Sequence, residues 1–145
     1  YNGQVYKSVL HEILRDHFPA YVCIGHSSQG SDFAPGLAMR LKGTCITGVS
    51  ALSVQEDKIC FSRDIYGGKI NADMVSNTET MVLTVQPGSF GTAPDKDRPR
   101  GNIYLKSISV SPQASVTLST SPFQTCDLDL SAAKVIVSAG RGVGE

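Results

Sequence analysis

Apolar residues recur at helical spacing near the start of the chain, and short apolar runs follow. Val5, Val9 and Ile13 fall on one face of a helix, so residues 5–17 predict an amphipathic helix with one side buried. The next run, 21–25 (YVCIG), is apolar throughout. A short apolar run after an amphipathic helix predicts a strand buried on both faces, as in a parallel sheet.

A second helix and a second strand continue this pattern. Ser31 or Asp32 is suited to cap the helix, with Pro35 in its first turn and residues 42–43 (KG) at its end. The run 45–54 is rich in small and β-branched residues and predicts a strand. Two strands joined by a helix form a right-handed parallel crossover. The first part of the chain is therefore predicted to be an α/β domain with a Rossmann-like parallel sheet and flanking helices.

The rest of the chain predicts strands separated by turns. Gly67 and Gly68 mark a turn, and residues 91–102 predict a surface loop or linker, because they combine proline and glycine with charged residues. The further strands are predicted at 59–63, 80–85, 103–110, 114–118 and 132–138.

The loop 26–32 follows the predicted strand 21–25. Open parallel sheets bind their ligands in loops at the carboxyl ends of strands, so this loop is the first place to look for a ligand. It contains His26, Ser31 and Asp32, but local crowding of these residue types is not the geometry of a catalytic triad. We therefore predict a polar loop that caps a helix or contacts a ligand, and we predict no catalytic residue.

A glycine-rich turn follows the predicted strand 132–138. Without side chains, the glycines of 140–144 (GRGVG) let backbone N–H groups approach a phosphate closely. Arg141 would add a planar, permanently charged guanidinium for a phosphate or a flavin edge. From the residues alone, nucleotide binding and an ordinary tight strand-to-helix turn both fit this pattern.

Charge is balanced along the chain. Its 145 residues include 13 basic and 13 acidic side chains, and no long run of one sign occurs. We therefore expect no nucleic acid as a partner. The longest apolar runs have the length of a strand, whereas a membrane span needs roughly 20 apolar residues. We expect no membrane span.

Cysteine and histidine spacings match no metal or redox motif. Three of the four cysteines lie in strand-like apolar runs, and we interpret them as reduced core residues. His11 and His17 do not share a helix face as metal ligands would, so no metal site is predicted. The four cysteines are Cys23, Cys45, Cys60 and Cys126.

Four segments, in order and with compatible spacing, resemble the alpha subunit of electron-transfer flavoproteins. That family's strand and loop, ending in Gly-Arg-Asp-Leu-Ala-Pro-Arg, are similar to residues 21–35 (YVCIGHSSQGSDFAP). Its Arg-Pro-x-Tyr-Gly-Gly-Asn element resembles 62–69 (SRDIYGGK), and its Thr-x-Arg-Pro-Gly-x-Phe strand resembles 84–90 (TVQPGSF). The strand and Gly-Arg-Gly turn that open its FAD domain are similar to 134–142 (KVIVSAGRG).

The resemblance implies three parts. An α/β domain, incomplete at its start, occupies 1–94, a connecting segment with edge strands occupies 95–131, and the opening strand of a FAD-binding domain lies in 132–145. By the match, Arg141 is a flavin contact, and Gly140 and Gly142 shape its turn.

The resemblance also implies a function. In this family the alpha subunit pairs with a beta subunit, and FAD carries electrons from dehydrogenases to a quinone reductase or another acceptor. The chain would then belong to an electron carrier rather than a catalyst. Its compartment would be the cytoplasm of a bacterium or archaeon, or the mitochondrial matrix.

The chain departs from the family pattern at five positions. It has Ser31, Gly36 and Gln86 where the family commonly has arginine, Lys69 in place of asparagine, and Asp64 in place of proline. Loss of three guanidinium groups removes bidentate pairing with carboxylates or phosphates. Two alternatives therefore stay open: a cofactor-free α/β domain for assembly or interaction, and a small adenine-nucleotide-binding enzyme that uses the loop after the first strand.

Overall fold

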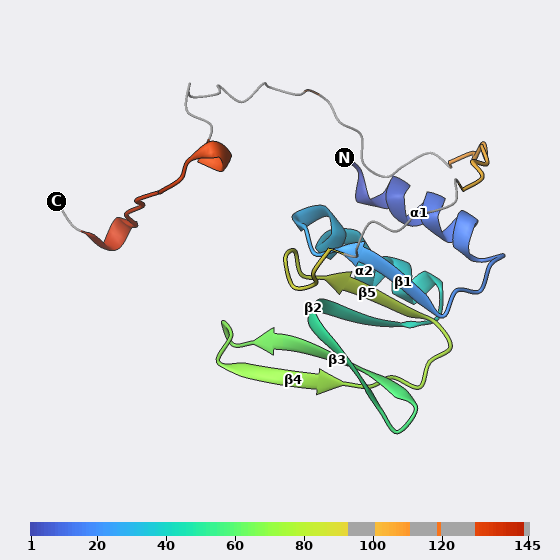
Figure 1. Ribbon diagram of the computed structural model, residues 1–145. Helices are drawn as coiled ribbons and strands as arrows, with labels where there is room; N and C mark the ends of the chain where they lie inside the picture. Colours follow the sequence, from blue (N-terminus) through green and yellow to red (C-terminus); the bar gives the residue numbers. More distant parts are fainter. Residues whose placement is uncertain (93–100, 111–118, 120–129, 144–145) are drawn as a thin grey trace. The chain divides into compact units, whose positions relative to one another are not determined.

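The computed structural model describes residues 1–92, 101–110, 119 and 130–143, and the chain divides into two compact units, Tyr1–Gln113 and Ala114–Glu145. The first unit contains the helices and strands labelled in Figure 1. In chain order they are α1 (Gly3–Leu14), β1 (Tyr21–Gly25), α2 (Ser28–Arg40), β2 (Thr44–Gln55), β3 (Lys58–Ile65), β4 (Ile70–Met74) and β5 (Met81–Val85). The described residues of the second unit form two short 3-10 turns, Leu130–Ala132 and Arg141–Val143.

The strands form one sheet in the order β1-β5-β2-β3-β4. β5 runs parallel to both β1 and β2, whereas β3 is antiparallel to β2 and β4. The predicted α/β class is confirmed, but the sheet is mixed rather than parallel. The reason lies between β2 and β3, where Glu56 (φ 48°) and Asp57 (φ 62°) are both left-handed. Two consecutive left-handed residues close a tight hairpin, and a hairpin makes its two strands antiparallel.

Side-chain caps determine where both helices begin. Oδ1 of Asn2 accepts hydrogen bonds from the amides of Gln4 (3.0 Å) and Val5 (3.4 Å) at the start of α1. Oγ of Ser27 accepts from the amide of Gly30 (3.1 Å) at the start of α2. Each cap satisfies amides that have no partner within the helix, and this stabilises the first turn.

The second helix begins earlier than the sequence predicts. Ser27 is its cap, so the predicted cap at Ser31 or Asp32 is wrong, and Pro35 lies inside the helix instead of in its first turn. Proline has no backbone N–H, so α2 lacks one amide hydrogen bond at Pro35. The predicted end of this helix is confirmed, because Lys42 adopts a left-handed backbone (φ 55°).

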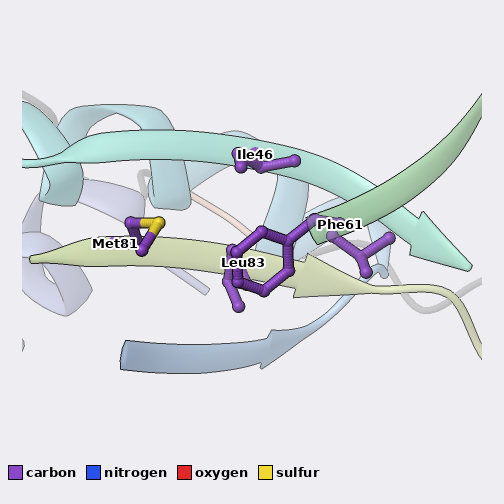
Figure 2. Packing of buried hydrophobic residues seen from close by; sticks show 5 residues of the cluster. Ile46, Phe61, Met81 and Leu83 are labelled. Carbon is purple, nitrogen blue, oxygen red and sulfur yellow. The ribbon is translucent and has the colours of Figure 1, made fainter. Parts of the chain in front are cut away.

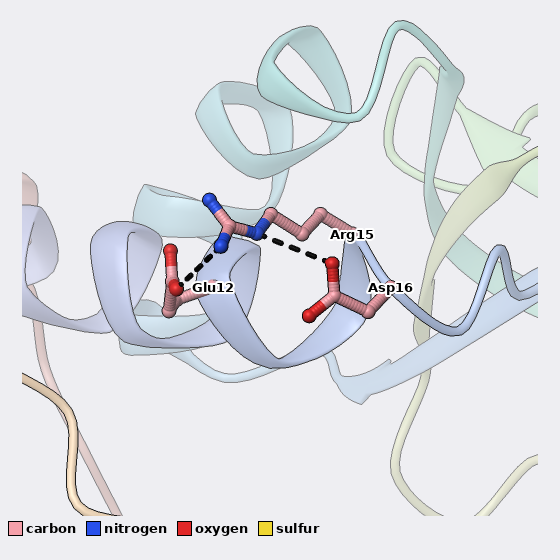
Figure 3. Close-up of polar contacts among 3 residues, drawn as sticks. All are labelled: Glu12, Arg15 and Asp16. Carbon is pink, nitrogen blue, oxygen red and sulfur yellow. Dashed lines mark ion pairs between the residues drawn. The ribbon is translucent and has the colours of Figure 1, made fainter.

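The first helix ends at Leu14, within the predicted range 5–17. Just after this end, the guanidinium of Arg15 forms ion pairs with Glu12 (2.8 Å) and Asp16 (3.3 Å) (Figure 3). These side chains are exposed, so the pairs contribute little to stability.

Two clusters of buried side chains lie on opposite faces of β5. On one face, Ala34 and Ala38 of α2 pack with Val82. On the other face, Phe61 of β3 packs with Leu83 and with neighbouring apolar side chains of β2 and β5, as Figure 2 shows. The complete second cluster is Ile46, Val49, Phe61, Met81 and Leu83.

β1 is an edge strand, and only its face toward α2 is packed, so the prediction that it is buried on both faces is wrong. Val22 and Ile24 pack toward α2, whereas Tyr21 and Cys23 alternate with them and are exposed. No strand in the described ranges pairs with the outer edge of β1. The unpaired edge exposes backbone groups of β1, and the face opposite α2, from which Tyr21 and Cys23 project, is only partly covered in the described part of the chain.

Two further predicted strands are not formed. Residues 103–110 and 132–138 contain no strand, and the predicted strand 114–118 lies outside the described residues. A strand needs a neighbouring strand for its backbone hydrogen bonds, and neither segment has such a neighbour in the described part of the chain. Apolar, β-branched composition is therefore insufficient to form these strands.

Replacing Leu83 with alanine should lower the free energy of unfolding by about 2–5 kcal/mol, because the change leaves a cavity in the core. Leu52→Ala is the matched control, since Leu52 is 53 % exposed while Leu83 is 3 % exposed. The control should cost less than about 1 kcal/mol. Urea denaturation followed by circular dichroism measures both, and equal losses would show that the core is misplaced.

Candidate functional site

The carboxyl ends of the parallel strands β1 and β5 lie beside the middle of β2, where residues 26–32 leave β1 and enter α2. The amide of His26 donates a hydrogen bond to the carbonyl of Val85 (2.8 Å), and the amide of Gln86 donates to the carbonyl of Val49 (2.9 Å). These bonds join the carboxyl ends of β1 and β5 to Val49 in the middle of β2. The predicted loop 26–32 is wrong in its extent: only His26 and Ser27 lie between β1 and α2, because residues 28–32 form the start of α2.

A fully buried hydroxyl lies beneath this loop. Oγ1 of Thr84 accepts a hydrogen bond from the amide of Gly48 (2.9 Å) and lies 2.8 Å from Nδ1 of His26. Oγ of Ser31 lies 3.3 Å from the same ring nitrogen. Whichever ring nitrogen carries the proton, these contacts connect the ends of β1 and β5 and the middle of β2 to the first turn of α2.

Gly48 brings its amide to Thr84 through an irregularity in β2. Its φ is 69°, and the pairing of β2 with β5 shifts between Ile46 and Val49. A left-handed residue within a strand forms a bulge that redirects the backbone, and glycine adopts that conformation without strain. The sequence patterns did not single out Gly48 or Thr84 as residues of this site. The available signal was a glycine interrupting the β-branched run 44–49.

Asp32 accepts a hydrogen bond from Tyr1. The hydroxyl of Tyr1 donates to Oδ2 of Asp32 (2.6 Å), and this hydrogen bond raises the pKa of Tyr1 to about 12. His26 instead contacts Thr84 and Ser31. Ser31 and His26 therefore contact each other, but Asp32 is bound by Tyr1 instead of His26, so these residues lack the relay of a nucleophile, a base and a carboxylate.

Arg63 of β3 lies beside the bulge. Its Nη1 donates to Oγ1 of Thr47 (2.9 Å), while its buried Nε has no hydrogen-bond partner among the described residues. Burial raises the pKa of the Cys45 thiol, and the charge of Arg63 opposes this rise. A thiol that stays protonated is a poor nucleophile, so the arrangement is structural rather than reactive.

The described cysteines are all free, as predicted, but they are not all in the core. Cys60 is buried and Cys45 is half-buried, whereas Cys23 is exposed on the edge strand. Cys126 lies outside the described residues. In the described part of the chain, no cluster of three or more His, Cys, Asp or Glu side chains is placed to hold a metal ion.

The predicted flavin contacts lie together in one turn of the second unit. Arg141 begins the 3-10 turn, and the amide of Val143 donates to the carbonyl of Gly140 (3.2 Å). A Cβ atom added to Gly140 or Gly142 would meet no atom within 4 Å. Both glycines therefore leave the turn open to close approach, although neither has a positive φ that would itself require glycine.

Comparison with known proteins identifies the family. A model of the electron transfer flavoprotein domain matches residues 1–107. The chain belongs to the electron transfer flavoprotein family. The resemblance inferred from the four sequence segments is confirmed.

Individual relatives agree with this assignment. The chain is 31 % identical over 144 residues to the electron transfer flavoprotein subunit alpha of Bacillus subtilis (strain 168), covering 99 % of this chain and 44 % of that protein. It is 30 % identical over 141 residues to the protein FixB of Escherichia coli O157:H7, covering 96 % of this chain and 45 % of that protein. The chain thus spans less than half the length of these relatives. None of the helices in the described ranges has the length and hydropathy of a membrane span.

Thr84→Val should lower the free energy of unfolding by about 1–3 kcal/mol, because it leaves the amide of Gly48 and the ring of His26 without their buried partner. Thr84→Ser is the matched control, since it keeps the hydroxyl. Amide hydrogen exchange adds a local measurement: the Gly48 amide should exchange faster in Thr84→Val only. If both variants protect it equally, the hydroxyl does not hold the bulge.

Proposed function

We propose that this chain is part of the alpha subunit of an electron-transfer flavoprotein. The observation that carries the proposal is the family match over residues 1–107, together with a relative whose name states that it is the alpha subunit. In this proposal a beta subunit completes a heterodimer, which carries electrons from dehydrogenases through FAD to a quinone reductase or another acceptor. The chain is then part of an electron carrier rather than of a catalyst.

The residues proposed to hold FAD are Arg141, Gly140 and Gly142. Open space at both glycines supports this assignment, because a phosphate can approach the backbone of the turn. The guanidinium of Arg141 would pair with an anionic group as a permanently charged, planar donor. FAD supplies the redox chemistry when bound, and the protein's part is to retain it and to set its electrostatic surroundings.

The domain limits belong to the same proposal. The α/β domain occupies 1–94, the connecting segment 95–131, and the start of the FAD-binding domain 132–145. The unpaired outer edge of β1 supports a first domain whose sheet continues beyond this strand, because exposed edges of parallel sheets are normally covered.

A cofactor-free assembly domain is the second candidate, and the departures from the family pattern favour it. At Gly36, one of the three positions without arginine, Cδ of Lys7 lies 2.6 Å from where a Cβ would be. A larger residue at Gly36 would therefore displace Lys7 from the seam between α1 and α2.

No observation favours the adenine-nucleotide-binding enzyme, since His26, Ser31 and Asp32 make the structural contacts described above.

The intact protein, co-expressed with its beta partner, should be yellow and show the absorption spectrum of a bound flavin. Purification of the complex followed by visible spectroscopy and FAD extraction tests this expectation. A stable but colourless complex without FAD would instead support the assembly domain. Recovery of no beta-like partner would contradict both candidates.

Arg141→Ala in the intact protein should weaken FAD binding by roughly tenfold or more, because a charge-assisted hydrogen bond is lost. It should also lower the flavin potential, since a positive charge beside the ring favours the reduced, anionic flavin. Arg15→Ala is the matched control, because it removes an exposed arginine of α1. FAD content and spectroelectrochemical titration measure both effects. Unchanged values in Arg141→Ala would remove this residue from the flavin site without removing the family function.

A further inference from the structure

Basic side chains gather along the seam between α1 and α2. Lys7, His11 and Arg15 follow one another at intervals of four residues, so they lie along one face of α1. Arg40 and Lys42, at the end of α2, lie with His11 and Arg15 around a surface hollow of about 220 Å³. We call these five residues the basic strip.

Most of the charge on the basic strip has no acidic partner. Arg15 is paired with Glu12 and Asp16 (Figure 3). Nη1 of Arg40 donates only to Oγ of Ser8 (3.0 Å). No ion pair of Lys7, Arg40 or Lys42 occurs among the described residues. The chain as a whole has a formal net charge of zero, so the strip is a local concentration of positive charge.

Helix dipoles explain part of this arrangement. His11 and Arg40 lie in the last turns of their helices, where a positive charge is favourable. Lys7 lies in the middle of α1, and the dipole does not account for it. The strip therefore contains more positive charge than capping of the two helices requires.

An exposed aromatic side chain borders the same hollow. Phe18 lines it and is 85 % exposed, and its backbone is left-handed, with a φ of 44°. A bulky residue is disfavoured in this conformation, which glycine or asparagine would adopt more readily. A strained, solvent-exposed phenylalanine beside unpaired cations has no role in the packing described here. Aromatic and arginine side chains are typical anchors of protein interfaces.

We propose that the basic strip and Phe18 form a docking surface for an acidic protein segment. Carboxylates of the segment pair with Lys7, Arg40 and Lys42, and one apolar side chain enters the hollow against Phe18. A polypeptide fits better than a membrane or nucleic acid, because Arg40 and Lys42 border a hollow instead of a flat face. The surface is on α1 and α2, so the proposal does not rest on the flavin site.

The test uses the intact protein and two synthetic peptides as probes, one with four Glu-Glu-Leu repeats and one with four Gln-Gln-Leu repeats. Fluorescence anisotropy at low salt should show that the acidic peptide binds at least roughly tenfold more tightly. Lys7→Gln and Arg40→Gln should each weaken it roughly threefold or more. Lys69→Gln, on the turn between β3 and β4, is the control that should retain full binding. Equal binding of the two peptides, or equal loss in Lys69→Gln, would overturn the proposal.

Phe18→Gly separates docking from folding. Glycine relieves the left-handed backbone, so the melting temperature should stay level or rise, while binding of the acidic peptide should weaken. A fall in melting temperature by several degrees would show that Phe18 serves the fold, and it would overturn its role as an anchor. Tighter binding to phosphatidylserine vesicles or to duplex DNA than to the acidic peptide would overturn the choice of partner.

Discussion

The burial of β5 between two parallel neighbours is the constraint on which the rest of the structure depends. β5 is the last strand within the described residues, yet it lies inside the sheet, between β1 and β2. Every backbone amide and carbonyl of such a strand must find a partner on one side or the other. Its side chains are buried on both faces, so α2 must cover one face and the cluster around Phe61 must fill the other.

Thr84 shows what the burial of β5 requires of its polar groups. It is a polar residue at the buried end of β5, and an unpaired hydroxyl there would destabilise the fold. The bulge at Gly48 and the ring of His26 supply its partners, so the ends of β1 and β5 and the bulge of β2 are connected to the start of α2. The contacts of His26 and Ser31, two of the residues that suggested chemistry, are thus explained by the packing of β5, whereas Asp32 is bound by Tyr1.

The two ends of the sheet have different chemistry. At the carboxyl end of β5, the hydroxyl of Thr84, the amide of Gly48 and the ring of His26 are hydrogen-bond partners of one another. The other end carries unpaired cations and the exposed Phe18. The proposed flavin residues lie in the second unit, around Arg141. The proposed docking surface and the proposed flavin residues therefore belong to separate units of the chain.

Local patterns in the sequence determined much of this protein. Helical spacing, the apolar runs and the glycine turns located α1, β1, β2, β5 and the turn at Gly67, and four ordered segments were sufficient to identify the family. These features depend on near neighbours in the chain, which the sequence displays directly.

The tertiary structure alone decided that β1 is an edge, that the sheet is mixed, that Ser27 rather than Ser31 caps α2, and that 103–110 does not form a strand. It also decided that Thr84 and Gly48 meet, because their contact joins residues 36 positions apart. Strand pairing and the hydrogen bonding of buried polar groups depend on which distant segments become neighbours. Composition and periodicity are local properties and do not determine which segments those are.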